Sequence, residues 1–173
     1  PLGATVVTFT YTDTDGNVGT DTAIVTIVDT TSPIVTAPTD ITVEAESAAG
    51  TSASNAAITS FLTDSSALDA VNPFPSFSHD GLTTFPLGIT DVTFTYTDAA
   101  GNAGTDIATV TVVDTTAPVI TLVGNNPLTV DLNSTFTDPG STVADTVSTG
   151  LTATVTGTVD TLTVGVYILS YDV

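Results

Sequence analysis

The fold is decided by a stretch that occurs twice: PLGATVVTFTYTDTDGNVGTDTAIVTIVDTTSPIVT at residues 1–36 and PLGITDVTFTYTDAAGNAGTDIATVTVVDTTAPVIT at residues 86–121. The two copies start 85 residues apart. That distance is about the size of one small β-sandwich domain. The chain is therefore expected to consist of repeated domains.

Each copy has the sequence pattern of a β-hairpin. Apolar and polar residues alternate from Val7 to Thr12 and from Val92 to Thr97, and again from Asp21 to Val28 and from Asp106 to Val113. Such alternation is typical of half-buried strands, and the Gly-Asn pairs between the runs favour a turn. Threonine, valine and isoleucine also suit pleated surfaces better than helices. The sequence therefore predicts an all-β fold.

An Asp-Thr-Thr-x-Pro linker follows each hairpin, at residues 29–33 and 114–118. Proline stiffens the chain and cannot donate to a central strand ladder, so these linkers are expected to be domain junctions. They divide the chain into the closing hairpin of one domain at 1–31, a complete domain at 32–117, and a domain that lacks its last strand at 118–173. Short strands in such number predict tandem immunoglobulin-like β-sandwiches joined by short proline-containing linkers.

Within the complete domain, four short strands are expected before the hairpin, near Ile34–Thr36, Ile41–Glu46, Ala56–Leu62 and Phe74–Ser78. Tyr11, Tyr96 and Tyr171 occupy matching strand positions, as in the tyrosine corner of immunoglobulin-like folds. Phe74, Phe77 and Phe85 are expected in the core, although the two prolines beside Phe74 could expose its ring.

Residues 32–117 resemble the hyalin repeat, an immunoglobulin-like extracellular module. The resemblance rests on four motifs: P-x-x-x-x-P-x-D-I-T-V (33–43), T-F-P-L-G-x-T-x-V-T-F-T-Y-T-D (84–98), A-G-N (100–102) and T-V-x-V-V-D-T-T-x-P (109–118). The family often has a cysteine where this sequence has Ala37. The resemblance therefore implies a lost disulfide, for which bound metal would be a substitute.

Residues 118–173 are similar to the bacterial immunoglobulin-like module of long surface proteins and adhesins. The motifs are NPLTV (126–130), STFTDPG (134–140) and VGVY (164–167). This resemblance implies a stalk or adhesion architecture. In this segment YILSYDV takes the place that VTFTYTD holds at 92–98, so the last hairpin strand is expected to be missing.

Almost all charged residues are acidic. The chain has 17 aspartates and two glutamates but no lysine or arginine, and its net charge is −19. Such a charge predicts strong self-repulsion at low salt unless cations bind. Short carboxylates at turns are ligands that calcium prefers, so calcium is the expected cofactor. The lack of basic residues excludes nucleic acid as a partner.

Two calcium sites are expected at the junctions, because an immunoglobulin-type sandwich brings the entering chain and two loops to the same end. The first is expected to gather Asp29, Asp64, Asp69, Asp98, Asn102 and Asp106. The second is expected to gather Asp114, Asp138 and Asp145, with one loop missing. The turn of Asp13, Asp15, Asn17 and Asp21, from a following segment or another subunit, is expected to fill that gap.

Local turn chemistry is the alternative explanation for these residues. Aspartate and asparagine satisfy backbone donors in turns and tolerate left-handed conformations, so turn preference alone predicts the same residue types. Unpaired carboxylates crowded at one end of a domain would repel one another, however. That repulsion favours a metal for the group as a whole.

Catalysis is not expected, because one histidine and no cysteine or lysine cannot assemble the familiar nucleophile and base sets. The expected function is mechanical: a structural repeat of a microbial extracellular filament, stalk or adhesin, rigidified by calcium. A calcium-dependent carbohydrate-binding module is the alternative. Such a module usually needs exposed aromatic platforms, and the chain has no tryptophan.

The expected location is extracellular, on a cell surface, where salt or calcium offsets the charge. Residues 1–173 contain no run of about 18 apolar residues that would span a membrane. The expected partners are neighbouring domains of the same chain or like subunits of a filament, with surface glycans as a further possibility. Two arrangements stay open: a window on one long chain, or a subunit that exchanges strands.

Overall fold

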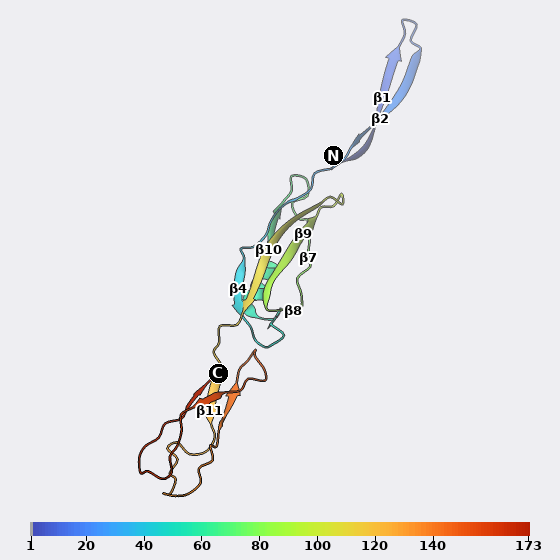
Figure 1. Cartoon of the computed structure of the whole chain (residues 1–173). Coiled ribbons are helices and arrows are strands. Elements are labelled where there is room, and N and C mark those ends of the chain that lie inside the picture. Colours follow the sequence, from blue (N-terminus) through green and yellow to red (C-terminus); the bar gives the residue numbers. More distant parts are fainter. Residues whose placement is uncertain (1) are drawn as a thin grey trace. The chain divides into compact units, whose positions relative to one another are not determined.

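The computed structural model describes residues 2–173, so Pro1, the first residue of the predicted N-terminal hairpin segment, lies outside the described residues. Strand β1 (Gly3–Thr12) pairs antiparallel with β2 (Val18–Ile27). The register runs from Gly3 opposite Ile27 to Thr12 opposite Val18. The hairpin predicted from the alternating pattern is therefore confirmed (Figure 1).

The second copy of the repeat belongs to a four-stranded sheet. Its strand order is β4 (Ile41–Glu44), β10 (Ala103–Val113), β9 (Gly88–Thr97) and β7 (Ser76–His79). Strand β10 runs parallel to β4, and β7 runs antiparallel to β9. Figure 1 shows these strands side by side. The copies therefore differ in context, because β1 and β2 form a two-stranded sheet of their own.

Two further pairs of short strands belong to the predicted complete domain. Strand β3 (Ile34–Thr36) pairs antiparallel with β6 (Ser66–Leu68), and β5 (Thr51–Ser52) pairs antiparallel with β8 (Thr84–Phe85). The predicted strands that correspond to β3, β4 and β7 are present. Strands β5, β6 and β8 are too short for their sequence to display a period of two.

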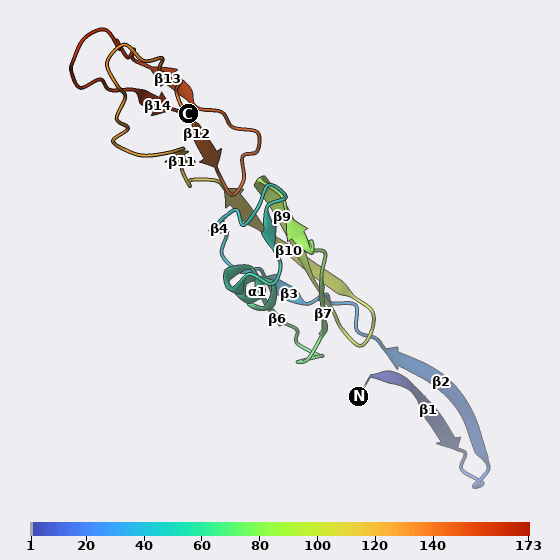
Figure 2. The ribbon, with the colours of Figure 1, turned by 90° about the horizontal axis from the view of Figure 1, so that it is seen from below.

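The segment near Ala56–Leu62 is a helix, α1 (Ala56–Thr63), and the prediction of a strand there is wrong (Figure 2). Ile58, Phe61 and Leu62 are all buried. Residues three and four positions apart lie on one face of a helix, whereas neighbours in a strand point to opposite faces. The spacing of the buried residues therefore fits only the helix.

Local hydrogen bonding also favours the helix. The side-chain Oδ1 of Asn55 accepts the backbone N–H of Ala57 at 3.0 Å, and its backbone oxygen accepts the N–H of Thr59 at 2.8 Å. Asparagine is a preferred N-cap residue, and alanine has the highest helix propensity. The helix therefore starts directly after Asn55, despite the β-rich composition around it.

The buried core includes apolar side chains at alternating positions of β9 and β10. Four of them are fully or almost fully buried: Val92, Phe94, Val110 and Val112. Phe85 is also fully buried, as predicted. Phe74 is 88% exposed and Phe77 is 41% exposed, so the expectation of a core position is wrong for both, and the alternative that the prolines beside Phe74 expose its ring is correct.

Residues 118–173 contain two short antiparallel pairs. Strand β11 (Val119–Leu122) pairs with β12 (Ser141–Ala144), and β13 (Thr154–Thr156) pairs with β14 (Ser170–Asp172). Strand β14 falls within the YILSYDV sequence that the repeat pattern predicts as a strand.

By Cα proximity, the chain groups into two compact units. One comprises residues Pro1–Thr39, Leu62–Gly81 and Val92–Ala108, and the other comprises Asp40–Phe61, Leu82–Asp91 and Thr109–Val173. These units do not follow the linkers, so the domain boundaries at 31/32 and 117/118 stay predictions. The only helix in residues 2–173 is too short to cross a membrane.

Candidate metal centre

Three carboxylates converge in the first of these units. Asp29 lies in the linker after β2, Asp69 directly follows β6, and Asp98 directly follows β9. One carboxylate oxygen from each residue lies within 4.8 Å of the other two. Asp98 is only 7% exposed, and the other two are partly buried. We call these three residues the carboxylate triad.

Asp98 is held by the turn that it starts. Its Oδ1 accepts the backbone N–H of Asn102 at 2.7 Å, and its Oδ2 accepts the side-chain amide of Asn102, also at 2.7 Å. Burial raises the pKa of Asp98, but hydrogen bonds from the side chain and backbone of Asn102 and from neighbouring turn amides outweigh it. The net pKa lies below the ordinary 3.8, so the carboxylate is charged at neutral pH.

Asn102 also connects the turn to the linker. Its side-chain amide donates to the backbone oxygen of Asp29 at 3.3 Å. The carboxylate Oδ1 of Asp29 accepts the backbone N–H of Thr31 at 3.1 Å. The hydrogen bond from the Asn102 amide thus holds the linker beside the Asp98 turn.

Asp69 has one oxygen in a turn and one without a partner. Its Oδ1 accepts the backbone N–H groups of Val71 at 2.9 Å and Asn72 at 2.6 Å. Its Oδ2 is buried and has no hydrogen-bond partner among residues 2–173. A buried carboxylate oxygen without a donor is costly, so it requires a partner that protein groups do not supply here.

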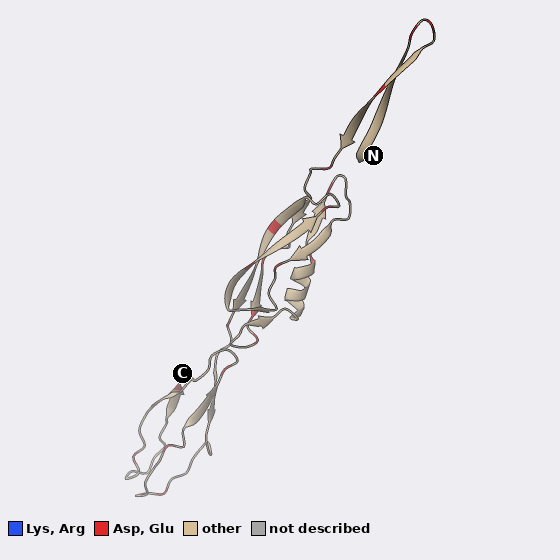
Figure 3. Cartoon of the chain, turned by 90° about the vertical axis from the view of Figure 1, so that its right-hand side faces the viewer, with Lys and Arg blue, Asp and Glu red and all other residues tan. Residues whose placement is uncertain are grey.

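The charge balance at the triad points to a cation. Three carboxylates at this separation repel one another. The chain has no lysine or arginine to offset them, and the ribbon in Figure 3 has red acidic positions but no blue ones. Calcium prefers six to eight oxygen ligands from carboxylates, backbone carbonyls and water. The oxygen-only donor set of the triad therefore fits calcium better than it fits zinc or copper.

The structure brings together part of the first predicted group. Asp29, Asp69, Asp98 and Asn102 meet, whereas Asp64 and Asp106 are not part of the triad. Asp64 follows the end of α1, where the prediction placed a strand and a loop. Asp64 as a ligand therefore stays a prediction.

Asp106 has a different role from the predicted one. Its Oδ2 accepts the backbone N–H of Ala37 at 2.9 Å, and its Oδ1 accepts that of Ile107 at 3.0 Å. These two hydrogen bonds lower the pKa of Asp106. Asp106 thus binds the backbone directly after β3.

The second predicted group does not converge. Asp114 accepts from the N–H of Thr116, and Asp138 accepts from the N–H of Gly140 and the hydroxyl of Tyr171. No second group of three carboxylates occurs in residues 2–173. The three residues of this group therefore lie in separate local turns and contacts.

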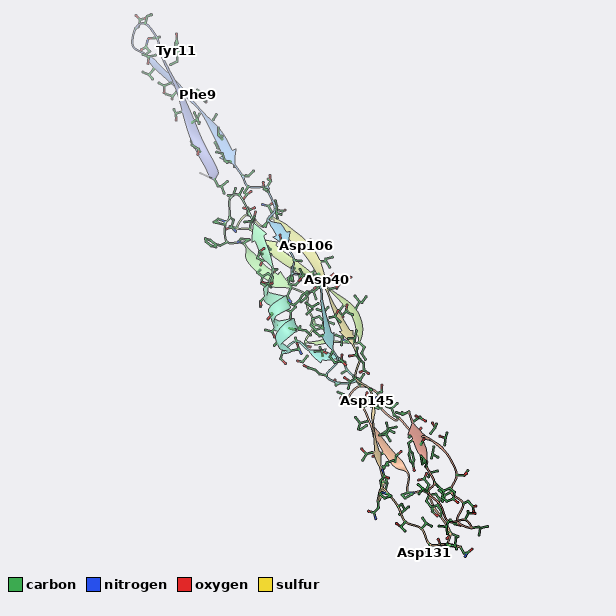
Figure 4. All side chains as sticks on the ribbon, turned by 90° about the vertical axis from the view of Figure 1, so that its left-hand side faces the viewer. Phe9, Tyr11, Asp40, Asp106, Asp131 and Asp145 are labelled. Atoms are coloured by element: carbon green, nitrogen blue, oxygen red, sulfur yellow. The ribbon has the colours of Figure 1, made fainter. Side chains whose placement is uncertain are left out.

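Asp145, the remaining member of that group, is a local copy of Asp69. It directly follows β12, and its Oδ1 accepts the N–H groups of Val147 at 2.8 Å and Ser148 at 2.5 Å (labelled in Figure 4). It therefore shares the turn geometry of Asp69 without the other carboxylates.

The turn of Asp13, Asp15 and Asn17 repeats the Asp98 turn. The Oδ1 of Asp13 accepts the N–H of Asp15 at 2.9 Å and that of Asn17 at 2.7 Å, and its Oδ2 accepts the Asn17 amide at 2.7 Å. Hydrogen bonds from the side chain and backbone of Asn17 lower the pKa of Asp13. Among the described residues this turn is not part of a group of three carboxylates, and its docking against a following segment or another subunit stays a prediction.

Two family models match the chain in succession. Residues 28–112 match the HYR domain, and residues 120–173 match the model described as bacterial surface protein, Ig-like domain. Neither is a family of enzymes. The strand-rich structure agrees with both matches.

Two curated sea urchin proteins, both named hyalin, are similar to this chain. That of Lytechinus variegatus is 41% identical over 128 residues, which cover 70% of this chain and 23% of the hyalin. That of Strongylocentrotus purpuratus is 39% identical over 133 residues, which cover 72% of this chain and 11% of the hyalin. The chain thus spans less than a quarter of either relative. It carries an HYR domain followed by a bacterial surface protein Ig-like domain, and its fold is all-β and immunoglobulin-like.

Proposed function

We propose that the chain is a structural repeat segment of an extracellular surface filament, stalk or adhesin, and that calcium bound at the carboxylate triad rigidifies it. The family matches to surface-type Ig-like domains support the structural and extracellular part. The observation that carries the calcium part is the triad itself, with the buried, unpartnered Oδ2 of Asp69.

The physical effect of calcium follows from where the three ligands originate. Asp29 belongs to the linker, whereas Asp69 and Asp98 belong to two separate turns of the HYR domain. An ion bound to all three converts their mutual repulsion into attraction to a common centre. The linker then has one preferred orientation relative to these turns.

The expected affinity is modest. Extracellular calcium modules bind with dissociation constants of about 10⁻⁴ to 10⁻³ M. At free calcium about 100-fold above the dissociation constant, one site adds about 2.7 kcal/mol to the free energy of unfolding. Occupancy therefore follows the calcium concentration of the surroundings.

Thermal melting in calcium and in chelator tests the proposal. We expect calcium to raise the melting temperature of the whole chain, and the Asp69→Asn variant to lose most of this rise. Asp145→Asn is the matched control, because Asp145 accepts the same two backbone hydrogen bonds outside the triad. Equal melting temperatures with and without calcium, or equal effects of the two variants, would refute the metal centre.

A second candidate function is calcium-dependent carbohydrate binding, and one residue favours it. The Phe74 ring is 88% exposed between two prolines, as an aromatic platform for a sugar would be. Its loop is attached to the triad, because Asn72 donates its N–H to Asp69 and accepts that of Phe74 at 3.4 Å. Glycan binding that is lost both in chelator and in the Phe74→Ala variant would favour this function. Glycan binding that survives both changes would exclude it.

A further inference from the structure

The chain contains one acceptor sequence for N-linked glycosylation, Asn133-Ser134-Thr135. The transferases that attach N-linked glycans recognise an asparagine followed by any residue except proline and then by serine or threonine. The chain has seven asparagines, and none of the other six has a hydroxyl residue two positions later. In a threonine-rich chain one such match can arise by chance, so the structural setting has to decide whether it is a site.

The acceptor sequence lies in a turn between β11 and β12, where residues 123–140 contain neither helix nor strand. Ser134 closes the turn: its backbone N–H and its hydroxyl both donate to the backbone oxygen of Asp131, at 3.1 Å and 2.6 Å. The backbone N–H of Asn133 donates to the backbone oxygen of Thr161 at 2.9 Å. Figure 4 labels Asp131, the first residue of this turn, at one end of the segment 118–173. The turn therefore has a fixed backbone.

The two side chains that a transferase must reach are accessible. Asn133 and Thr135 are both exposed, and neither side chain makes a hydrogen bond within residues 2–173. Ser134, which lies between them, is half-buried and supplies the hydroxyl that closes the turn. A glycan is bulky and has to stay on the surface of the folded protein. The exposed amide of Asn133 meets that requirement.

The backbone conformation of Asn133 is unusual for this chain. Its φ is 62°, and it is the only residue other than glycine with a positive φ in residues 2–173. Nine glycines occupy the other positions of positive φ. Glycine adopts this conformation without steric cost, whereas asparagine is only tolerated there. Backbone geometry therefore explains why most side chains are excluded at position 133, but not why an asparagine stands where glycine serves elsewhere.

Hydrogen bonding distinguishes Asn133 from most other asparagines of the chain. Four of them use the side-chain amide in hydrogen bonds with the protein: Asn17, Asn55, Asn72 and Asn102. Asn125 and Asn126 make no such bond within residues 2–173, but Pro127 and Leu128 stand two positions after them. Asn133 thus combines an amide without a partner and the hydroxyl residue that a transferase requires.

We propose that Asn133 is a site of N-linked glycosylation, with an oligosaccharide on a lipid pyrophosphate as the donor. The Nδ2 of Asn133 forms a bond to the anomeric carbon of the first sugar, and the bond between that carbon and the phosphate oxygen breaks. The lipid pyrophosphate leaves with the electron pair, and the amide loses one proton to a base of the transferase. The Thr135 hydroxyl is recognised and is not consumed. The proposal rests on the extracellular part of the proposed function and not on calcium.

Secretion of the whole chain from yeast, which has an N-glycosylation pathway, followed by mass spectrometry, is the test. We expect one glycan per chain, which peptide N-glycosidase removes while converting the modified asparagine to aspartate. Trypsin has no cleavage site in this chain, so an aspartate-specific protease supplies the peptide that starts at Asp131. A folded, secreted chain without a glycan at Asn133 overturns the proposal.

Two variants of Thr135 test the recognition step. Thr135→Val removes the hydroxyl but keeps the branched shape, so it should abolish the glycan. Thr135→Ser keeps the hydroxyl and should retain the glycan. Because Thr135 is exposed and its side chain makes no hydrogen bond in the described residues, both variants should keep the strand content of the wild type in circular dichroism. A glycan that persists in Thr135→Val, or that is lost entirely in Thr135→Ser, contradicts the proposal.

Asn133→Gly tests whether the side chain has a structural role instead. Glycine accepts the positive φ, and the Asn133 amide has no partner within residues 2–173 to lose. The melting temperature of the chain without glycan should therefore be nearly unchanged by this substitution. A marked fall would assign the amide to the turn and overturn the proposal.

The glycosylation site and the metal centre can fail separately. Asn133→Gln removes the acceptor amide but none of the triad carboxylates. Glycosylation at Asn133 in a wild-type chain that shows no calcium response refutes only the metal centre. A calcium response in a secreted chain that carries no glycan refutes only the glycosylation site.

Discussion

At the scale of single residues, the same turn serves two purposes in the chain. Asp98 with Asn102 and Asp13 with Asn17 make identical pairs of side-chain hydrogen bonds. Only Asp98 has two further carboxylates beside it. The turn is therefore a consequence of local sequence, and the carboxylate triad is a consequence of what the fold brings to that turn.

This comparison makes Asp98→Asn and Asp13→Asn a matched pair. Asp98→Asn should lower calcium affinity at least tenfold, because it removes a buried charged ligand, whereas Asp13→Asn should leave it within about twofold. Isothermal calorimetry with calcium measures both. Equal losses in the two variants would mean that turn integrity, and not the triad, controls binding.

The sequence predicts the three residues of the triad, but it does not predict which of the other aspartates lie outside it. Asp29, Asp69 and Asp98 follow strands or occupy the linker, and the repeat places such positions at one end of a domain. Asp64 directly follows α1, a helix that the alternating pattern does not predict, so its position relative to the triad could not be predicted. The role of Asp106 depends on its contact with Ala37, a residue 69 positions away.

At the scale of elements, the repeat supplies one strand pair in two environments. Strands β9 and β10 lie within a four-stranded sheet, whereas β1 and β2 pair only with each other. Alternation predicts both hairpins equally well, because it reports which face can be buried and not whether anything covers it. The β-rich composition of the chain does not predict the helix α1, although the spacing of Ile58, Phe61 and Leu62 indicates it.

Phenylalanine truncation should separate the two environments. Phe94→Ala removes a fully buried ring and should lower the free energy of unfolding by about 3–5 kcal/mol. Phe9→Ala changes an exposed ring and should have little effect in dilute protein. Urea unfolding of both variants provides the values. A large loss for Phe9→Ala at low concentration would show that the hairpin is already covered within one chain.

Glycine substitution should also distinguish the environments of the two hairpins. A Cβ on Gly104 would lie 1.9 Å from the backbone oxygen of Pro33, in the linker, whereas one on Gly19 would meet only the backbone oxygen of Tyr11, at 3.9 Å. Gly104→Ala should therefore markedly lower the melting temperature, because linker and β10 must move apart. Gly19→Ala should leave it nearly unchanged. Tolerance of alanine at both positions would contradict the close approach of the linker to β10.

The linker after β10 has a contact with a glutamate, which the pattern of turn aspartates does not predict. Glu44, the last residue of β4, accepts the backbone N–H and the hydroxyl of Thr115, both at 2.8 Å, and the hydroxyl of Thr116 at 2.9 Å. These hydrogen bonds lower the pKa of Glu44, the backbone bond from Thr115 most. The two threonines of the Asp-Thr-Thr linker sequence thus donate hydrogen bonds to the carboxylate of a glutamate.

At the scale of the whole molecule, this acidic chain without lysine or arginine holds many of its carboxylates by hydrogen bonds. Several of these groups have lowered pKa values through hydrogen bonds from backbone or side-chain donors: Asp13, Glu44, Glu46, Asp98, Asp106 and Asp160. No lysine or arginine takes part in any of them. Of these six carboxylates only Asp98 is buried, so the hydrogen bonds stabilise the charged form mainly at exposed positions.

The pH dependence of stability follows from these shifts. A group whose folded pKa lies below its unfolded value stabilises the fold above the unfolded pKa, and this contribution is lost as pH falls through the folded pKa. The unfolded values are 3.8 for aspartate and 4.5 for glutamate. In chelator and high salt, where self-repulsion is screened, the melting temperature should therefore fall as pH drops below about 4.5. A melting temperature that rises in this range would contradict the assigned hydrogen bonds.

The central claim is that Asp29, Asp69 and Asp98 share one calcium ion. A crystallographic density map of the chain grown with calcium, with anomalous data, tests it most directly. The account predicts an anomalous peak about 2.3–2.6 Å from one carboxylate oxygen of each residue, including the Oδ2 of Asp69. A map with no peak there and with the three carboxylates turned apart into solvent would contradict it.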